Sequence, residues 1–471
     1  MNVATQAYAV RWRDANRWDI KAARATQFRL AHPHFRPLAH FAEEATVTVN
    51  PAAKPDHEWP VYGVNNSTGV FLSHRQRGAD FNSAYKRIEK DWFFHNPTRA
   101  NVGSLGRVPD VPADAITSPE YQVWRLTAQL IPAFVEILIR TRYFLELIDC
   151  HRVGAVKERL FVSNLLEIPV PDLAEPQQRA IVTAFEKSKS KAAALRAKAD
   201  ELDAAVEADF LKALGLTPPA ARTLPKVLAV QWSDAERWSV LFHQIAAIAV
   251  DLDSGKYAPK PLGELLTLVQ YGSSQKADRS GRGTPIIRMN NIVDGVFDLC
   301  DLKYVQLSKA ETESLLLERN DILINRTNSK ELVGKCAVFE AEGAFVFASY
   351  LIRLRADDDR ADPAFLAYVI NGSIGRGQID QVSRQIGGQA NINTEEIRAL
   401  RIPCPDPDVQ RSLMKPVLAA RKRTAALREQ AAEAERAAFD LAERLILGDN
   451  PEGIANSGRL EVLQSREERG A

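Results

Sequence analysis

The sequence predicts a mixed α/β (α+β) protein made of two related modules, each followed by a long helix. Three observations support this prediction: an internal repeat, a heptad pattern after each copy of it, and short strand and helix patterns in between. At 471 residues the chain is too long for one hydrophobic core, so two or three domains are expected. We therefore expect two globular modules separated by two long antiparallel helices, which form an intramolecular coiled coil with a pseudo-twofold relation from the duplication.

The repeat is clearest at the start of each half. Residues 9–19 read AVRWRDANRWD and return at 229–239 as AVQWSDAERWS, with seven identities in eleven positions. The segment 168–172, IPVPD, returns at 402–406 as IPCPD, and Gln178 returns as Gln410. Solenoid repeats run about 20–50 residues, so the much longer period here indicates duplicated domains.

A long helix is predicted after each Ile-Pro-x-Pro motif. From Ile181 to Val206, and again from Leu413 to Leu445, apolar or small residues alternate at spacings of four and three. Such heptads are typical of helices that pack against one another, and Gly215 and Gly448 follow as C-caps. About 40 residues at 1.5 Å each make a helix of roughly 60 Å. A spacer between the modules and a plain packing element both fit this pattern. Pro416 predicts a late start or a kink in the second helix.

The residues before each helix predict an α/β module. Strands are expected at 59–64, 91–95, 284–289 and 321–325, and helices at 130–147 and 362–371. The predicted domains are a first module at 1–172, a first long helix at 173–215, a second module at 216–404, a second long helix at 405–448 and a flexible polar tail at 449–471.

Composition excludes several classes of protein. The formal net charge of +1 argues against a chain that coats nucleic acid through a large positive field, although local basic faces are compatible with it. The four cysteines are scattered singly, which suggests neither a zinc site nor a disulfide framework. Because the N-terminal residues are charged and no run of about 18 apolar residues occurs, we expect a cytoplasmic protein.

The motifs of catalysis are missing or incomplete. Residues 96–99, NPTR, approach the Asn-Pro-Pro-aromatic motif of N6-adenine methyltransferases, but the third residue is not proline and Arg99 replaces the aromatic residue. The sequence has no GxxxxGK[ST] loop for ATP and no HExxH pair. Its acidic clusters lack the Glu-x-Lys partner of restriction-type nucleases. We therefore expect a chain that catalyses nothing and binds no metal.

Polar loops in both modules have the residue types that contact DNA. Arg and Lys can bind guanine, Asn and Gln can bind adenine, and hydroxyl groups can bind phosphate. Glycine-rich polar loops are also ordinary surface loops, and a basic cluster can be a solvated face. The candidate DNA-binding residues are Asn65, Asn66, His74, Arg75, Arg77, Tyr85, Lys86, Arg99, Lys276, Arg279, Arg282, Arg288, Asn290, Asn291, Arg326, Asn328, Lys330, Arg384, Gln385, Gln389 and Asn391.

The order of module, Ile-Pro-x-Pro motif and long helix, stated twice, resembles the specificity subunit of Type I restriction-modification enzymes. The second half carries the closer resemblance, in TPIIRMNNI at 284–292, DILINR at 321–326 and GQANIN at 388–393. In the first half, YGVNN at 62–66 and NPTRANVG at 96–103 look like another branch of the same domain family. The resemblance covers residues 9 to 448.

The resemblance implies a function for each part. Each module would be a target recognition domain that reads one half of a bipartite DNA site, and the coiled coil would fix the number of unread base pairs. The partners implied are double-stranded DNA, two methyltransferase subunits that bind S-adenosylmethionine, and restriction subunits that use ATP and Mg²⁺. The chain itself would bind no cofactor. Because the modules differ outside the shared motifs, the target would be asymmetric.

Two other readings stay open from the residues alone. One is a structural adapter whose modules bind proteins, and DNA binding that weakens steeply with salt would separate the two. The other is a DNA methyltransferase in its own right, which binding of S-adenosylmethionine by the purified chain would reveal.

Overall fold

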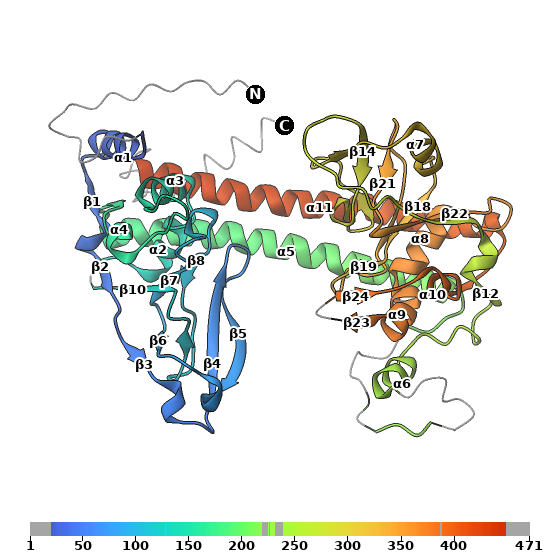
Figure 1. Cartoon of the computed structure of the whole chain (residues 1–471), viewed down its shortest axis with the longest axis horizontal. Coiled ribbons are helices and arrows are strands. Elements are labelled where there is room, and N and C mark those ends of the chain that lie inside the picture. Colours follow the sequence, from blue (N-terminus) through green and yellow to red (C-terminus); the bar gives the residue numbers. More distant parts are fainter. Residues whose placement is uncertain are drawn as a thin grey trace. The chain divides into compact units, whose positions relative to one another are not determined.

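The computed structural model describes residues 20–127, 129–218, 225, 227–230, 239–386 and 389–448 (Figure 1). The repeated segment 9–19, most of its second copy and the tail 449–471 lie outside these residues. The chain divides into two compact units. The first comprises Met1–Arg196 and Arg428–Ala471, and the second comprises Ala197–Leu427. Each unit contains both strands and helices, which confirms the mixed α/β class. The predicted domain limits stay predictions.

The first unit is built on two sheets. A four-stranded antiparallel sheet has the order β2-β10-β7-β8, and a five-stranded sheet has the order β3-β6-β9-β4-β5 with β4 and β9 parallel. The elements before the long helix are α1 (Ile20–Ala31), β1 (Phe35–Pro37), β2 (Ala42–Glu44), β3 (Thr48–Val49), β4 (Glu58–Asn65), β5 (Gly69–Arg77), β6 (Tyr85–Arg87), β7 (Phe93–His95), β8 (Leu105–Arg107), β9 (Ile116–Thr117), β10 (Gln122–Leu126), α2 (Pro132–Leu138), α3 (Arg142–His151), α4 (Val162–Leu165) and β11 (Pro169–Pro171).

The core of the first unit lies between its four-stranded sheet and the helices. Phe93 stacks on Trp124 with ring centroids 4.5 Å apart, and both are fully buried. Phe134 and Phe144 join this cluster from the helices. The single helix predicted at 130–147 is wrong, because α2 and α3 are separate helices. Thr141 lies between them with extended backbone angles and is the N-cap residue of α3.

The second unit repeats the same plan with different additions. Its four-stranded sheet is β13-β22-β18-β20, and smaller sheets are formed by β17-β14-β21 and β19-β24-β23. The elements are α6 (Val240–Ala246), β12 (Pro259–Pro261), β13 (Leu266–Tyr271), β14 (Thr284–Ile287), β15 (Ile292–Val293), β16 (Val296–Phe297), β17 (Lys303–Val305), α7 (Lys309–Leu315), β18 (Ile322–Asn325), β19 (Thr327–Asn328), β20 (Cys336–Val338), β21 (Val346–Phe347), β22 (Leu351–Ala356), α8 (Pro363–Asn371), α9 (Ser373–Val382), β23 (Arg384–Ile386), β24 (Gln389–Asn391), α10 (Thr394–Arg398) and β25 (Arg401–Pro403).

The two units share one scaffold. In each four-stranded sheet the strand that comes first in the chain pairs with the last one, which pairs with the second, which pairs with the third. The Ile-Pro-x-Pro segment forms a two-stranded antiparallel sheet in both units, as β1-β11 and as β12-β25. In the first unit α1 contacts α3, the helix that follows α2. In the second unit α6 contacts α9, the helix that follows α8. The repeat in the sequence therefore corresponds to a repeat in the fold.

A buried glutamine makes the same three hydrogen bonds in each unit. The side chain of Gln178 donates to the carbonyls of Gln129 and Leu173 and accepts from the amide of Ile131. Gln410, 232 positions later, donates to the carbonyls of Arg360 and Pro405 and accepts from the amide of Asp362. Both side chains are fully buried. Each glutamine therefore fixes the start of a long helix to the segment that leads into α2 in the first unit or into α8 in the second.

The two long helices are α5 (Glu175–Ala213) and α11 (Pro407–Leu447). Each contributes its residues to both units. In the first unit they run antiparallel, since the rings of Phe185 and Phe439 are 4.8 Å apart while Arg196, further along α5, pairs with the earlier Glu435 at 2.6 Å. The predicted heptad positions that are buried are Ile181, Ala192, Ala199, Val417, Ala420, Thr424, Ala431 and Ala438.

The ends of the long helices follow from local chemistry. Gly215 has φ of +76°, and the amide of Leu216 donates to the carbonyl of Leu211, which is a Schellman pattern and confirms the C-cap predicted at Gly215. The late start expected for the second helix is wrong. Pro407 begins α11, and the helix continues through Pro416. The kink given as the other outcome for Pro416 stays a prediction.

Among the described residues, no helix is long and apolar enough to cross a membrane.

Candidate nucleic-acid interface

The two longest strands of the first unit, β4 and β5, form a hairpin. β5 is the edge strand of the five-stranded sheet, and the candidates His74, Arg75 and Arg77 lie exposed along it (Figure 1). A bulge interrupts the pairing next to His74, whose ring nitrogens contact Ser73 Oγ and Gln76 Oε1. An edge strand with a bulge and charged side chains resists pairing with other chains and offers its side chains to a ligand.

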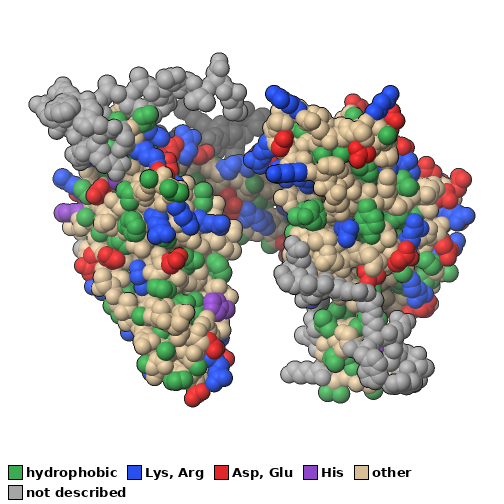
Figure 2. Space-filling view, in the orientation of Figure 1, with side chains coloured by type: hydrophobic (Ala, Val, Ile, Leu, Met, Phe, Trp, Pro, Cys, Tyr) green, Lys and Arg blue, Asp and Glu red, His purple; other side chains and the backbone are tan. Residues whose placement is uncertain are grey.

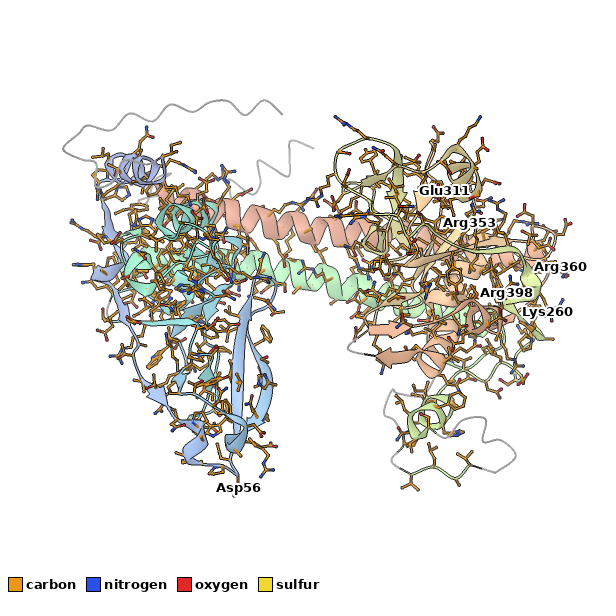
Figure 3. The ribbon with its side chains drawn as sticks, in the orientation of Figure 1. Asp56, Lys260, Glu311, Arg353, Arg360 and Arg398 are labelled. Atoms are coloured by element: carbon orange, nitrogen blue, oxygen red, sulfur yellow. The ribbon has the colours of Figure 1, made fainter. Side chains whose placement is uncertain are left out.

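Arg75 and Arg77 differ in their partners. Arg77 pairs with Asp56 at 3.0 Å, and Figure 3 labels Asp56 at the far end of the hairpin. The Arg75 side chain makes no hydrogen bond or ion pair within the described part of the chain. Arg75 is thus the cation of this strand that is most available for a phosphate.

The turn of the hairpin places two candidates in different roles. Asn65 Oδ1 accepts hydrogen bonds from Ser67 and from both the amide and the hydroxyl of Thr68, so this side chain closes the turn. Asn66 is exposed and lies beside Gly103, where an added Cβ would be 3.2 Å from Asn66 Oδ1. The hairpin turn and the loop before β8 therefore meet at Asn66.

Arg140 lies under this turn and was missed by the sequence reasoning. It follows α2, and its Nη2 would be 2.7 Å from a Cβ added at Gly69. Its Nε is buried without a hydrogen-bond partner. A single arginine after an apolar helix gives no signal in the sequence, because only the fold brings it to the hairpin.

The segment 96–99 is a structural turn. Asn96 Oδ1 accepts from the amide and the hydroxyl of Thr98, and the Pro97 carbonyl accepts from the amide of Leu160. Arg99 is exposed at the start of the following short 3₁₀ helix. An asparagine whose side chain closes its own turn cannot also hold a target amine, which agrees with the rejection of a methyltransferase motif here.

Tyr85 and Lys86 are half-buried and have partners inside the first unit. Tyr85 packs edge-on against Phe81 at 4.7 Å, and Lys86 Nζ donates to the Tyr121 carbonyl at 2.8 Å. Burial lowers the pKa of Lys86, and the charge of Glu44 opposes this shift. Both side chains would have to leave these contacts to reach DNA.

In the second unit the glycine-rich segment 272–283 forms a loop between β13 and β14. A Cβ at Gly272 would be 2.3 Å from the Phe347 carbonyl oxygen, so only glycine allows β13 to pass so close to β21. The candidates Lys276 and Arg282 are exposed on this loop, whereas Arg279 pairs with Asp301 at 3.1 Å. The Arg279 guanidinium lowers the pKa of the Asp301 carboxyl.

Two of the candidates that follow β14 make hydrogen bonds within the second unit, and one is exposed. Arg288 donates to the Asp301 carbonyl at 2.9 Å and to its carboxylate at 3.3 Å. Asn291 is buried, donates to the Asp298 carbonyl and accepts from the Arg288 amide. Asn290 is exposed. Of these three, Asn290 is the one whose side chain faces solvent.

The third group of candidates surrounds the short sheet β19-β24-β23. Asn391 Oδ1 accepts from the Thr327 hydroxyl at 2.6 Å, and Asn328 Oδ1 accepts from the Ser329 amide. Lys330 is exposed. The guanidinium of Arg326 lies over the ring of Tyr271 at 4.8 Å from its centroid. The side chains of Arg384, Gln385 and Gln389 lie outside the described part of the chain.

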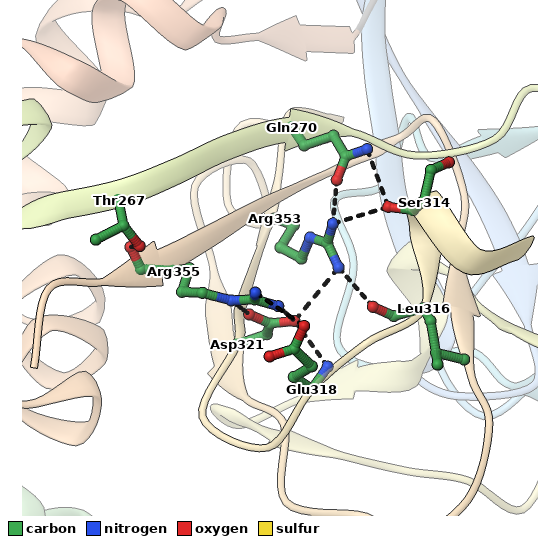
Figure 4. A network of polar contacts seen from close by, with 8 residues as sticks. All are labelled: Thr267, Gln270, Ser314, Leu316, Glu318, Asp321, Arg353 and Arg355. Carbon is green, nitrogen blue, oxygen red and sulfur yellow. Dashed lines mark hydrogen bonds and ion pairs between the residues drawn. The ribbon is translucent and has the colours of Figure 1, made fainter. Parts of the chain in front are cut away.

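A buried ionic network in the second unit was not predicted from the sequence (Figure 4). Asp321 is fully buried between Arg353 and Arg355, with its oxygens 3.5 Å and 2.8 Å from their guanidinium groups. Arg353 also donates to Gln270 and to the carbonyls of Ser314 and Leu316. Burial lowers the pKa of Arg353, and the charge of Asp321 opposes this shift. The network ties the end of α7 to the sheet of β13, β22 and β18.

Charge is mixed on the face of each unit that Figure 2 shows. In the view of Figure 2, Lys and Arg side chains lie between Asp and Glu side chains and hydrophobic ones. Within the described residues no group of three or more His, Cys, Asp or Glu side chains could hold a metal ion. The cations available for a polyanion are therefore particular exposed side chains, such as Arg75, Arg99 and Lys276, rather than a uniform basic face.

Comparison with known proteins finds a match to a family model in the second unit. Residues 255–422 match the family model of the Type I restriction modification DNA specificity domain. The chain is 26% identical over 158 residues to a putative type I restriction enzyme MjaX specificity subunit of Methanocaldococcus jannaschii, covering 33% of this chain and 37% of that protein. It is 26% identical over 156 residues to the type I restriction enzyme EcoKI specificity subunit of Escherichia coli, covering 32% and 33%. The chain thus spans about a third of the length of the curated relatives it matches.

Solved structures similar to this chain include two from restriction systems. The HsdS subunit from Thermoanaerobacter tengcongensis has a TM-score of 0.37 at 17% identity, and the match covers 88% of this chain and 97% of that one. A chain from a study of assembly of the type I R-M system has a TM-score of 0.46 at 18% identity, covering 88% and 98%.

The resemblance found in the sequence is confirmed by the matched domain and the curated relatives. Residues 255–422 match the Type I restriction modification DNA specificity domain, and the chain is similar over about a third of its length to specificity subunits of Type I restriction enzymes.

Proposed function

We propose that this chain is the non-catalytic DNA sequence-recognition subunit of a Type I restriction-modification complex. Each unit reads one half of a bipartite, asymmetric DNA target. The chain directs adenine methylation and restriction, which partner subunits carry out.

The observation that carries this proposal is the repeated scaffold. The matched specificity domain lies in the second unit, and the first unit has the same strand order and the same buried glutamine contacts. A scaffold that occurs twice in one chain supports two recognition surfaces. Since the second is a DNA specificity domain, a second DNA half-site is the simplest ligand for the first.

The surfaces on this scaffold support an asymmetric target. The first unit presents the long hairpin of β4 and β5, whereas the second presents the glycine-rich loop before β14 and the helix α7. Different side chains on equivalent positions read different bases. Two half-sites of different sequence follow.

We further propose that the two long helices form an antiparallel coiled coil that sets the number of unread base pairs. Both helices contribute residues to both units, and many of their buried heptad positions are alanine. A fixed connection suits half-sites that lie on one face of DNA, which recur about every 34–36 Å along the duplex.

The partners in this proposal are double-stranded DNA, two methyltransferase subunits and the restriction subunits. S-adenosylmethionine, ATP and Mg²⁺ belong to the partner subunits and not to this chain. The chemistry of the described residues agrees with such a division, because the segment nearest to a methyltransferase motif is the structural turn at Asn96.

The test is selection of DNA from a library of random duplexes by the purified chain, alone and with the subunits that co-purify with it. The expected result is one enriched sequence with two blocks of specified bases and a gap of constant length. Enrichment of no sequence, or capture of proteins whose binding is unaffected by salt, would refute a DNA-reading role.

A further inference from the structure

Arg326 and Tyr271 form a stacked pair in the second unit, in which Tyr271 is exposed and Arg326 is partly buried. The Arg326 guanidinium carbon lies 4.8 Å from the centroid of the Tyr271 ring, and Tyr271 is 40% exposed. The pair joins the end of β13 to the residue between β18 and β19. Stacking of a guanidinium on a tyrosine face fixes its plane while leaving its edge free.

The backbone of Arg326 is fixed from two sides. Its amide donates to the Tyr350 carbonyl at 3.0 Å, and its carbonyl accepts from the Ile392 amide at 2.9 Å. Tyr271 is held at its other end, where its hydroxyl is 3.5 Å from the Thr394 hydroxyl. Both ends of the pair are therefore set by the scaffold before any ligand arrives.

The side-chain hydrogen-bond donors of Arg326 have no acceptor within the described residues. Its Nε is buried without a partner, and its terminal nitrogens have neither a carboxylate nor a carbonyl acceptor there. Other arginines of this unit are occupied, as Arg279 and Arg288 are by Asp301 and Arg353 is by Asp321. A rigid arginine with free donors is suited to bind a planar pair of acceptors, because little side-chain freedom remains to be lost.

The same position of the first unit has different chemistry. The Pro97 carbonyl accepts from the Leu160 amide as the Arg326 carbonyl does from Ile392, and the Asn96 and Asn325 amides donate to equivalent carbonyls at Ser104 and Lys335. At this equivalent backbone position the first unit therefore has proline and the second unit has the stacked arginine. The two units differ in the side chain at this position, as is expected of a residue that specifies a base.

We propose that Arg326, held on the face of Tyr271, reads a guanine in the half-site of the second unit through the O6 and N7 acceptors. This inference rests on the proposed DNA-reading function. Bidentate pairing of arginine with guanine is the commonest specific contact in the major groove. Tyr271 is a positioning residue that keeps the guanidinium in the plane the base requires.

The experiment is the random-duplex selection repeated with variants of the full chain in its co-purified complex. Arg326→Ala is expected to lower the preference for guanine at one position of one half-site by roughly 10- to 100-fold, and to leave the other half-site unchanged. Arg326→Lys keeps the charge but loses the two parallel N–H donors of the guanidinium. This variant is therefore expected to lose most of the same preference. Tyr271→Phe keeps the ring and the preference, whereas Tyr271→Leu weakens it.

The matched control is Arg398→Ala, which removes another exposed arginine of this unit, labelled in Figure 3, that stacks on no aromatic ring among the described residues. It should leave every base preference unchanged. Should Arg326→Ala fail to fold, Arg326→Lys and Tyr271→Leu decide the question.

Two results would overturn the inference, and they differ from failure of the proposed function. One is a split site that Arg326→Ala still selects with every base preference intact. The other is uniform weakening on all sequences that Arg326→Lys restores, which would make Arg326 a phosphate contact. If the unaltered complex enriches no sequence, the proposed function fails and the inference falls with it.

Discussion

Replacing Gln410 with leucine tests whether the repeated glutamine holds each long helix to its unit. The change removes three hydrogen bonds from a fully buried side chain and leaves the carbonyls of Arg360 and Pro405 and the amide of Asp362 without these partners. Each hydrogen bond contributes about 1 kcal/mol net, and each buried group left unsatisfied costs about 1–3 kcal/mol, so a loss of about 3–5 kcal/mol is expected. That is a large part of the 5–15 kcal/mol typical of a domain.

The assay is hydrogen exchange of the whole chain, followed for peptides of each unit. Gln410→Leu should raise exchange in α8 and at the start of α11, and Gln178→Leu should do the same in α2 and at the start of α5. The matched controls are Arg411→Leu and Arg179→Leu. Each removes an exposed ion pair one residue further on, and such pairs contribute only about 0–1 kcal/mol. If each glutamine variant exchanged like its control, the buried glutamines would not hold the helices.

Three further predictions concern charge. Burial lowers the pKa of His95 from 6.5 to about 4, while its Nε2 contacts the Leu160 carbonyl. Below pH 6.5 the unfolded chain therefore binds a proton that the folded chain refuses, so stability should fall between pH 6.5 and 4 by about 3 kcal/mol relative to His95→Gln; parallel unfolding curves for the two proteins would contradict this. Asp321→Ala leaves Arg353 buried without its carboxylate and should cost about 3–5 kcal/mol in denaturant titrations, so a cost under about 1 kcal/mol would show that the network contributes little. DNA affinity should fall roughly 10³-fold or more between 50 and 200 mM salt if about six phosphates are contacted, and a flat salt profile would argue against a DNA backbone contact.

The main features of the fold could be predicted because their signals are local. Heptads without glycine predict long helices whatever surrounds them, and the repeated motifs mark the duplication. The break between α2 and α3 at Thr141 was missed because apolar residues continue across it. The role of Gln178 was also missed, since a glutamine on a helix is usually exposed and only the tertiary structure buries it.

The candidate site was predictable as a set of residue types and loops, but not as individual contacts. Asn65, Asn291 and Asn391 have the chemistry of base readers, yet each bonds to a neighbouring segment of its own unit. Tyr271 and Arg140 gave no signal, because their proximity to Arg326 and to the hairpin turn is created by residues far apart in sequence. Contact with DNA stays a prediction for every candidate.

The most direct test of the central claim is sequencing of methylated bases in the host genome with and without this gene. The account predicts that deletion removes methylation from one split, asymmetric motif, with modified adenines in both halves on opposite strands, and that the intact gene restores it. A methylome in which split motifs are present but unaffected by deletion would contradict the claim that this chain reads them.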